Sequence, residues 1–303
     1  MLTTSKKDSK LKIRYNSREV LTAVLFLLPT MIFLFGFCYY PSFNAIKGSL
    51  YSWDGFNDPR WVGIQNYQRL LKDPIFLQSL KNVFVWAIGS ITVSLIAPLI
   101  SAIMIFQLRS KRLQYWYRVA FVLPMVVSAV VIIKIWTFIY EPNIGILNTF
   151  LRTAGLDVLT RNWLGEKAFV IPSLVFVGFP WVSGFNLLIF YAGLQNIPVD
   201  VLEYAQIDGC KKLQRIIHID LPLITGQVKL LLILGVIGTL QNITLPLLMT
   251  GGGPGYDSYT PGLYMYDQAF SRGQFGMANT IATVMFSIIM VLTLVSMRLR
   301  RQT

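Results

Sequence analysis

Polar side chains lie inside two of the most apolar stretches of this sequence. The stretch 169–194 contains Gly178, Trp181 and Asn186 around Pro180, and the stretch 229–249 contains Thr239, Gln241, Asn242 and Thr244. An amide without a hydrogen-bond partner is costly in an apolar environment. We therefore expect these side chains to face other protein groups or a cavity. They either join packed helices by hydrogen bonds or line the path of a polar solute.

Residue types that could perform catalysis are sparse. His218 is the single histidine, so the sequence shows neither a histidine-based metal site nor a catalytic dyad. The phosphate-binding pattern G-x-x-x-x-G-K-[ST] is absent, and the glycine-rich run 251–255 has no lysine and predicts only a turn. No apolar stretch carries the carboxylate cluster typical of a proton-coupled pump. These observations disfavour a membrane enzyme and nucleotide binding by this chain.

One polar segment, EYAQIDGCKKLQRIIHIDLPLI from Glu203 to Ile224, has helical periodicity. One apolar side is predicted from Val201, Leu202, Ala205 and Ile207, and a second, after Gly209, from Leu213, Ile216, Ile217 and Leu221. We expect Pro222 to end the second pattern. Two short amphipathic helices joined at a glycine either lie on a membrane surface or insert into a groove on another protein.

The composition indicates the elements that position these residues. Hydrophobic residues make up 54% of the 303 residues and charged residues only 14%, with a mean hydropathy of +0.56, whereas soluble domains carry about 25% charged residues. Six stretches are long enough to span a bilayer. They are 20–40, 83–106, 119–140, 169–194, 229–249 and 277–297. Their prolines, Pro29, Pro98, Pro124, Pro172, Pro180 and Pro246, favour bent helices or a lined cavity.

Lysine and arginine predict the orientation. They are concentrated in the tail 1–19, the connection 107–118, the loop 195–225 and the C-terminal residues 298–303. By the positive-inside rule, both termini and the loop 195–225 are expected in the cytoplasm. The net charge of +13 is explained by this bias and requires no nucleic acid. Lys134 lies inside a span, where it either extends to the membrane surface or faces a polar path.

The loop resembles the EAA loop of permease subunits from bacterial ABC importers, whose pattern is E-A-A-x-x-x-G followed by I-x-L-P. Glu203, Ala205, Gly209, Ile219, Leu221 and Pro222 match it, and Tyr204 departs from it. The segments LYSWDGF, WVGIQNY and LQNIPVDVLEYAQIDG are similar to carbohydrate-importer permeases, and LMTGGGPGYDSYT is similar to the MalF-like half of the paired permeases. The resemblance implies an all-α membrane protein with six transmembrane helices and the type I importer permease fold.

The resemblance also implies a division of the chain. It comprises a cytoplasmic tail 1–19, a first span 20–40, an outer loop 41–82, a five-helix core 83–298 that includes the loop 195–225, and a tail 299–303. We call residues 195–225 the coupling loop, because in this family it docks on the ATPase. The residues implied in coupling are Glu203, Tyr204, Ala205, Asp208, Gly209, Ile219, Leu221 and Pro222, and those implied in the substrate path are Gly178, Trp181, Asn186, Gln241, Asn242 and Thr244.

The implied partners are a second, MalG-like permease subunit, a cytoplasmic ABC ATPase dimer, a solute-binding protein outside the membrane, and the bilayer. The chain itself is expected to bind no cofactor and no metal, with ATP and Mg²⁺ held by the ATPase, in a bacterial plasma membrane. The function implied is ATP-driven import of a sugar or oligosaccharide. A non-sugar solute such as glycerol phosphate, or an ATP-independent secondary carrier, are the alternatives; equal internal halves, common in secondary carriers, are not evident.

Overall fold

The computed structural model describes residues 17–300, so most of the expected tail 1–19 and the last residues of the tail 299–303 lie outside the described part. The chain divides into two compact units, one up to Lys47 and one from Gly48 onward. In the first unit, the elements are α1 Ser17–Leu34, the π-helix η1 Phe35–Tyr39 and α2 Tyr40–Gly48. They form a continuous apolar helix over Leu21–Gly48, long enough to cross a membrane and exposed along its length.

The second unit begins with a short antiparallel pair and a helical column. Its first elements are β1 Tyr51–Ser52, β2 Arg60–Trp61, α3 Gln65–Lys72, α4 Pro74–Phe106, α5 Lys111–Val122, the 3₁₀ turn η2 Leu123–Val126, α6 Ala129–Ile139, α7 Ile146–Thr153 and the 3₁₀ turn η3 Asp157–Leu159. β1 pairs antiparallel with β2, with Tyr51 opposite Trp61. α4 begins at Pro74 rather than in the expected region near residue 83, because the Asp73 carboxylate accepts hydrogen bonds from the backbone N–H of Ile75 and Phe76 and caps the helix.

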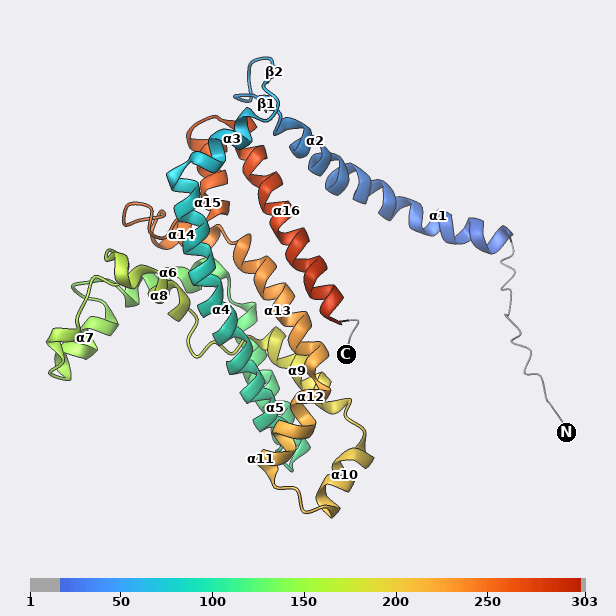
Figure 1. Cartoon of the computed structure of the whole chain (residues 1–303). Coiled ribbons are helices and arrows are strands. Elements are labelled where there is room, and N and C mark those ends of the chain that lie inside the picture. The colour runs from blue at the N-terminus through green and yellow to red at the C-terminus, as the bar shows by residue number, and fades with distance from the viewer. Residues whose placement is uncertain (1–16, 301–303) are drawn as a thin grey trace. The chain divides into compact units, whose positions relative to one another are not determined.

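The remaining elements complete the column and the coupling loop. They are α8 Lys167–Phe176, α9 Gly184–Gln195, α10 Val199–Ile207, α11 Lys212–Arg215, the π-helix η4 Ile216–Asp220, α12 Leu221–Leu223, α13 Thr225–Leu240, α14 Thr244–Met249, α15 Pro261–Tyr266, the π-helix η5 Asp267–Ser271 and α16 Phe275–Arg300. In the second unit, α10–α12 lie at one end of the column and α3 with β1 and β2 at the other (Figure 1).

α4 is the central support of the second unit. Its 33 residues extend about 50 Å at the rise of an α-helix, and it packs against α8, α9 and α13. Three buried apolar clusters follow its length, one each around Phe190, Tyr264 and Leu174. The cluster around Phe190 joins α4 to α9 and to Ile224 at the end of the coupling loop. The end of the coupling loop therefore packs in the same apolar cluster as the last turns of α4.

Three expected spans are not continuous helices. α5 with η2 and α6 bend by 88°, residues 177–183 separate α8 from α9, and residues 241–243 separate α13 from α14. A proline is close to each break: Pro124 lies in η2 just before the first, Pro180 within the second, and Pro246 in the first turn of α14 just after the third. Proline cannot donate a backbone hydrogen bond and crowds the preceding turn. Pro29, Pro98 and Pro172 instead lie inside helices.

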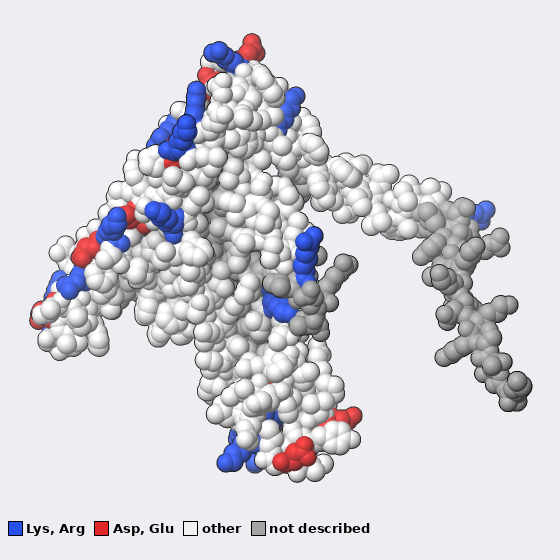
Figure 2. All heavy atoms as spheres, viewed as in Figure 1, with Lys and Arg blue, Asp and Glu red and all other residues white. Residues whose placement is uncertain are grey.

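By length and composition, three helices of the described part qualify as membrane spans, and up to six if each bent pair counts as one. Charged residues gather at the end of the second unit that carries α10 and α11, at the end near α3, and along the arm that carries α7, whereas most of the surface over α4 and α13 is uncharged in this view (Figure 2). The chain is an all-α integral membrane protein. Lys134 is exposed on α6.

Candidate functional sites: the coupling loop and two cavities

Gly209 divides the coupling loop by ending α10 in a left-handed turn. Its φ is +69°; the N–H of Cys210 donates to the carbonyl of Ala205 and the N–H of Gly209 to that of Gln206. This is the Schellman arrangement, in which glycine is preferred because other residues are strained at positive φ. A side chain at this position would meet no atom within 4 Å. The glycine is therefore needed for the turn and not for close packing of α10 on a neighbouring helix.

The inner side of the loop differs from the expected apolar stripes. Ala205 is buried, and Val201, Leu202, Ile216 and Leu221 pack against the core. Four other apolar side chains point outward: the exposed fractions are 68% for Tyr204, 80% for Ile207, 67% for Leu213 and 50% for Ile217. The predicted apolar sides are thus divided between the core and the surface, because the bend at Gly209 and the π-helix η4 change which positions face the core.

The helix at the end of the loop stops close to the predicted place. α11, η4 and α12 run on as one helix, 212–223, which ends one residue after Pro222, and the chain bends by 64° before α13. Ile219 and Leu221 are half-buried, and Asp220 is fully buried beside Arg215, with 3.4 Å between Oδ2 and Nε. The other carboxylate oxygen, Oδ1, has no partner among the described residues.

α10 carries an acidic face. Asp200, Glu203 and Asp208 are all exposed, and they accompany the exposed Tyr204 and Ile207. The acidic side chains lie toward the α10 side of the tip and basic side chains toward the α11 side (Figures 1 and 2). The first half of the loop thus presents an apolar patch with negative charge around it, a composition suited to a groove with basic rims.

A cavity of about 370 Å³ lies at the break between α8 and α9. Of the predicted path residues, Gly178 and Trp181 line it, together with polar side chains that include Ser90 and Ser94. Gly178 and Trp181 both have positive φ, +85° and +59°. The Trp181 indole N–H donates to the carbonyl of Val175 at 3.0 Å, and its ring packs edge-on against Phe176 and Phe179. The break therefore brings one amphipathic aromatic side chain to the cavity wall.

Asn186 has a different environment. Its side-chain amide donates to the carbonyl of Ser94 at 2.9 Å, and it does not line the cavity. Ser94 lies four residues before Pro98, whose missing N–H leaves that carbonyl without its helical partner. Asn186 supplies the missing donor from α9. The sequence shows both residues, but their hydrogen bond depends on the packing of α9 against α4, which the sequence does not reveal.

The three predicted path residues near the α13–α14 break also do not line this cavity. Gln241 and Thr244 are exposed, and Asn242 is half-buried. The Asn242 side-chain oxygen accepts a hydrogen bond from the backbone N–H of Leu245, at 3.1 Å, in the first turn of α14. Leu245, a neighbour that we did not predict, reaches the cavity instead. Because Leu245 is an apolar residue within an apolar run, nothing in the sequence marks it as a residue that lines a cavity.

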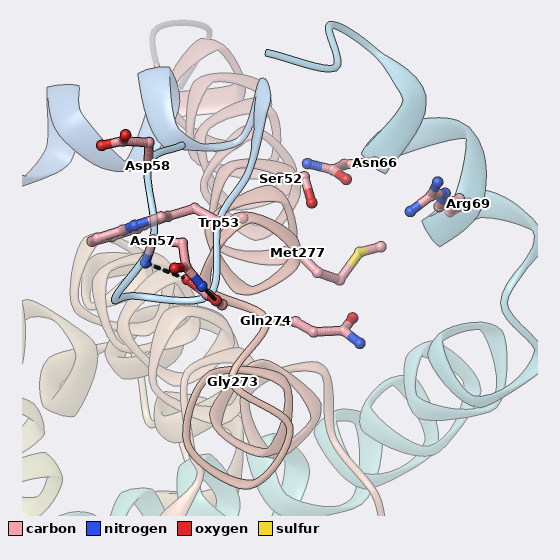
Figure 3. Close-up of a pocket in the computed structure, with 11 residues that line it drawn as sticks. Ser52, Trp53, Asn57, Asp58, Asn66, Arg69, Gly273, Gln274 and Met277 are labelled. Atoms are coloured by element: carbon pink, nitrogen blue, oxygen red, sulfur yellow. Dashed lines mark hydrogen bonds between the residues drawn. The ribbon is translucent and has the colours of Figure 1, made fainter. Parts of the chain in front are cut away.

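A polar cavity of about 300 Å³ lies at the other end of the second unit. In Figure 3, Trp53 and Asn57 lie on one side, Asn66 and Arg69 of α3 on another, and Gln274 nearby. The Asp54 carboxylate accepts hydrogen bonds from the backbone N–H groups of Asn57 and Phe56 in the turn that follows it. These hydrogen bonds hold the pKa of the carboxyl below the usual value. Sequence reasoning did not select these residues.

The comparisons with known proteins agree with this architecture. A family model described as "Binding-protein-dependent transport system inner membrane component" matches residues 94–302. The "Probable ABC transporter permease protein YurN" of Bacillus subtilis is 34% identical over 90% of this chain and 94% of its own length. The "Diacetylchitobiose uptake system permease protein NgcF" of Streptomyces coelicolor is 32% identical over 87% of this chain and 77% of its own length.

A solved structure shares the fold. It is a chain of a bacterial ABC transporter involved in the import of the acidic polysaccharide alginate, with a TM-score of 0.81 and 22% identity over 94% of this chain and 96% of that chain. The resemblance found in the sequence is confirmed, as is the type I importer permease fold. The chain belongs to the family of binding-protein-dependent transport system inner-membrane components, the permease subunits of ABC importers.

Proposed function

We propose that this permease imports a sugar or oligosaccharide and that the coupling loop transmits the motion of a separate ATPase to it. The saccharide class is supported by relatives named for sugar uptake, including NgcF and the "Multiple sugar-binding transport system permease protein MsmF" of Streptococcus mutans, which is 26% identical over 91% of this chain and 94% of its own length. The names of these relatives favour a sugar over a non-sugar solute and an ABC importer over a secondary carrier.

The observation that carries the proposal is the exposed face of α10. Tyr204 and Ile207 expose most of their surface although they are apolar, and Glu203 is exposed close to them in the chain. Exposed apolar groups rimmed by charge mark an interaction surface. The Schellman turn at Gly209 sets how α10 ends, and Val201 and Leu202 of α10 pack against the core, so a force on α10 is passed to the core through them.

The partners follow from this proposal. The coupling loop faces the cytoplasm and meets one subunit of an ATPase dimer, which holds ATP and Mg²⁺. A second, MalG-like permease completes the membrane part, in a bacterial plasma membrane with both termini inside. The end that carries the polar cavity at Trp53 and Arg69 faces a solute-binding protein; a structure similar to this chain was solved in complex with an alginate pentasaccharide-bound periplasmic protein.

Solute passage is proposed along the cavity at the α8–α9 break. Trp181 presents an aromatic ring and Ser90 and Ser94 line the same cavity, a combination that suits a ligand with apolar faces and hydroxyl groups. Gln241, Asn242 and Thr244 remain proposed for the path on the other side of the α13–α14 break. Asn186 is assigned instead to the α4–α9 contact.

The test uses Glu203→Lys and Gly209→Val, each measured for sugar uptake and for co-purification of the ATPase. Lysine reverses the charge of the proposed contact, and valine is strained at a φ of +69° by about 1–2 kcal/mol. We expect both variants to reach the membrane and to lose most of their uptake. The matched control is Gly209→Asn, because asparagine tolerates the left-handed conformation, and it should transport. Normal uptake and normal ATPase retention in both test variants would overturn the proposal.

A further inference from the structure

A third cavity, of about 450 Å³, lies between the α4–α5 connection and the coupling loop. Its wall combines the C-terminal end of α4, the connection 107–110, the start of α5, the end of α9, and parts of α10 and α11. The lining residues that matter below are Phe106, Arg109, Lys111, Val199, Leu202, Lys212 and Arg215. None of the residues that form the exposed face of α10, Glu203, Tyr204 and Ile207, belongs to the lining.

Four cationic side chains converge on this cavity. They are Arg109, Lys111, Lys212 and Arg215, and the lining contains no aspartate or glutamate. Within residues 17–300, only Arg215 of these four forms an ion pair with a carboxylate, that of Asp220. Arg109, Lys111 and Lys212 are exposed and carry uncompensated charge. Gathered like charges raise the local potential and attract an anion.

The same cavity has an apolar wall. Phe106, Ile197, Val199 and Leu202 line it, and 64% of the Val199 surface is exposed. Phe106 is the last residue of α4, a helix apolar enough to cross a bilayer. The cavity therefore lies where the hydrocarbon region gives way to the head groups. A site that is cationic on one side and apolar on the other fits an amphiphile better than a small soluble anion.

A buried polar network holds the cationic wall in place. Gln114 of α5 is buried and lines the cavity; its side-chain N–H groups donate to the carbonyls of Leu108, at 2.7 Å, and Phe106. Its side-chain oxygen accepts a hydrogen bond from the Tyr191 hydroxyl of α9 at 2.9 Å. The backbone of the connection that carries Arg109 is thus fixed to α5 and α9 before any ligand arrives.

We propose that this cavity binds the phosphate head group of an anionic phospholipid. Basic pockets at the cytoplasmic ends of membrane helices recognise such head groups, and here the acyl chains would follow the apolar wall at Phe106 and Val199. Arg109 belongs to the α4–α5 connection and Lys111 begins α5, whereas Lys212 and Arg215 belong to the coupling loop. One bound lipid therefore bridges two parts of the chain and stiffens the loop against the core.

Neighbouring residues provide a charge-matched experiment. The test variant is Lys111→Gln with Lys212→Gln, and the control is Arg112→Gln with Lys211→Gln. Both remove one cation from α5 and one from the coupling loop, but Arg112 and Lys211 do not line the cavity. Each transporter, with the subunits that co-purify, is reconstituted with phosphatidylcholine and phosphatidylglycerol. Lipids retained after detergent extraction are then counted by native mass spectrometry.

We expect the test variant to lower the affinity for phosphatidylglycerol by about 25-fold, because each cation near anionic head groups contributes about fivefold. The control should stay within about twofold of the wild type, because Arg112 and Lys211 do not line the cavity and solvent and salt screen their attraction to a head group bound in it. Equal loss in both variants would overturn the proposal, since it would show attraction to surface charge alone. Equal retention in all three proteins would overturn it as well.

A separate arm distinguishes the lipid from a soluble phosphate. Inorganic phosphate and glycerol phosphate are titrated against the reconstituted wild type while retained phosphatidylglycerol is measured. We expect neither to displace the lipid at millimolar concentration, because neither contacts the apolar wall. Displacement by both at such concentrations would assign the cavity to a soluble anion. Loss of ATPase co-purification in the test variant, with the lipid still retained, would assign it to the protein partner.

Discussion

At the scale of single residues, Asn186 shows how a side chain that resembles a ligand-binding group can have another task. Its amide donates to the carbonyl that Pro98 leaves without a partner in α4. The same reasoning applies to Asn242, whose side-chain oxygen accepts a hydrogen bond from the first turn of α14. Polar residues in apolar helices can thus satisfy backbone groups that prolines and helix breaks expose.

The Asn186–Ser94 contact gives a double-mutant prediction. Asn186→Leu leaves the Ser94 carbonyl without a donor, and we expect it to lower the free energy of unfolding by about 1–3 kcal/mol. Pro98→Ala restores the helical N–H at position 98, so Asn186→Leu should cost much less in that background. Thermal unfolding of the four proteins in detergent measures the coupling. An equal cost of Asn186→Leu in both backgrounds would contradict the proposed role.

At the scale of elements, the helix breaks are the main feature that periodicity did not locate. Apolar runs of sufficient length predicted the spans, and the prolines predicted bends, but nothing local showed that Pro98 remains in a straight helix while Pro180 separates α8 from α9. The difference comes from tertiary packing: Asn186 compensates Pro98, whereas Gly178 and Trp181 adopt left-handed conformations beside Pro180. Likewise, the turn at Gly209 was predicted, but which apolar side chains after it pack against the core and which are exposed depends on the π-helix η4.

Capping of α14 gives a prediction at this scale. Asn242→Leu removes the acceptor for the N–H of Leu245, and we expect it to lower stability by about 1 kcal/mol. Asn242→Ser keeps an acceptor at nearly the same place and should stay within a few tenths of a kcal/mol of the wild type. Thermal unfolding compares the two variants. Equal stability of the Asn242→Leu and Asn242→Ser variants would show that this hydrogen bond does not stabilise the fold.

At the scale of the whole molecule, the sequence predicted the class and the family, and it singled out the loop for which a partner is proposed. It did so because composition, charge bias and the E-Y-A-x-x-D-G segment are local signals. Of the cavities, the sequence indicated only two lining residues, Gly178 and Trp181, because each cavity joins segments far apart in the chain. The cavity at Trp53, for example, joins residues 52–69 to residues 273–277.

The two cysteines allow a test of orientation. In a Cys38→Ser background, Cys210 of the coupling loop is the single remaining thiol. We expect a membrane-impermeant maleimide to label it in inverted membranes and not in intact cells, because the loop is proposed to be cytoplasmic. Cys210→Ser with Asp58→Cys, which places a thiol in the turn between β1 and β2, should show the reverse pattern. Labelling of Cys210 in intact cells would contradict the proposed orientation.

The separation of charge at the tip of the second unit has one more consequence. Acidic side chains lie on the α10 side and basic side chains on the α11 side (Figures 1 and 2), so the surface of the tip has a negative half and a positive half. A partner with complementary charges fits it one way round, and turning that partner by half a revolution would place like charges against each other. In the proposed transporter, this separation of charge would orient each ATPase subunit as it approaches, before any apolar contact forms.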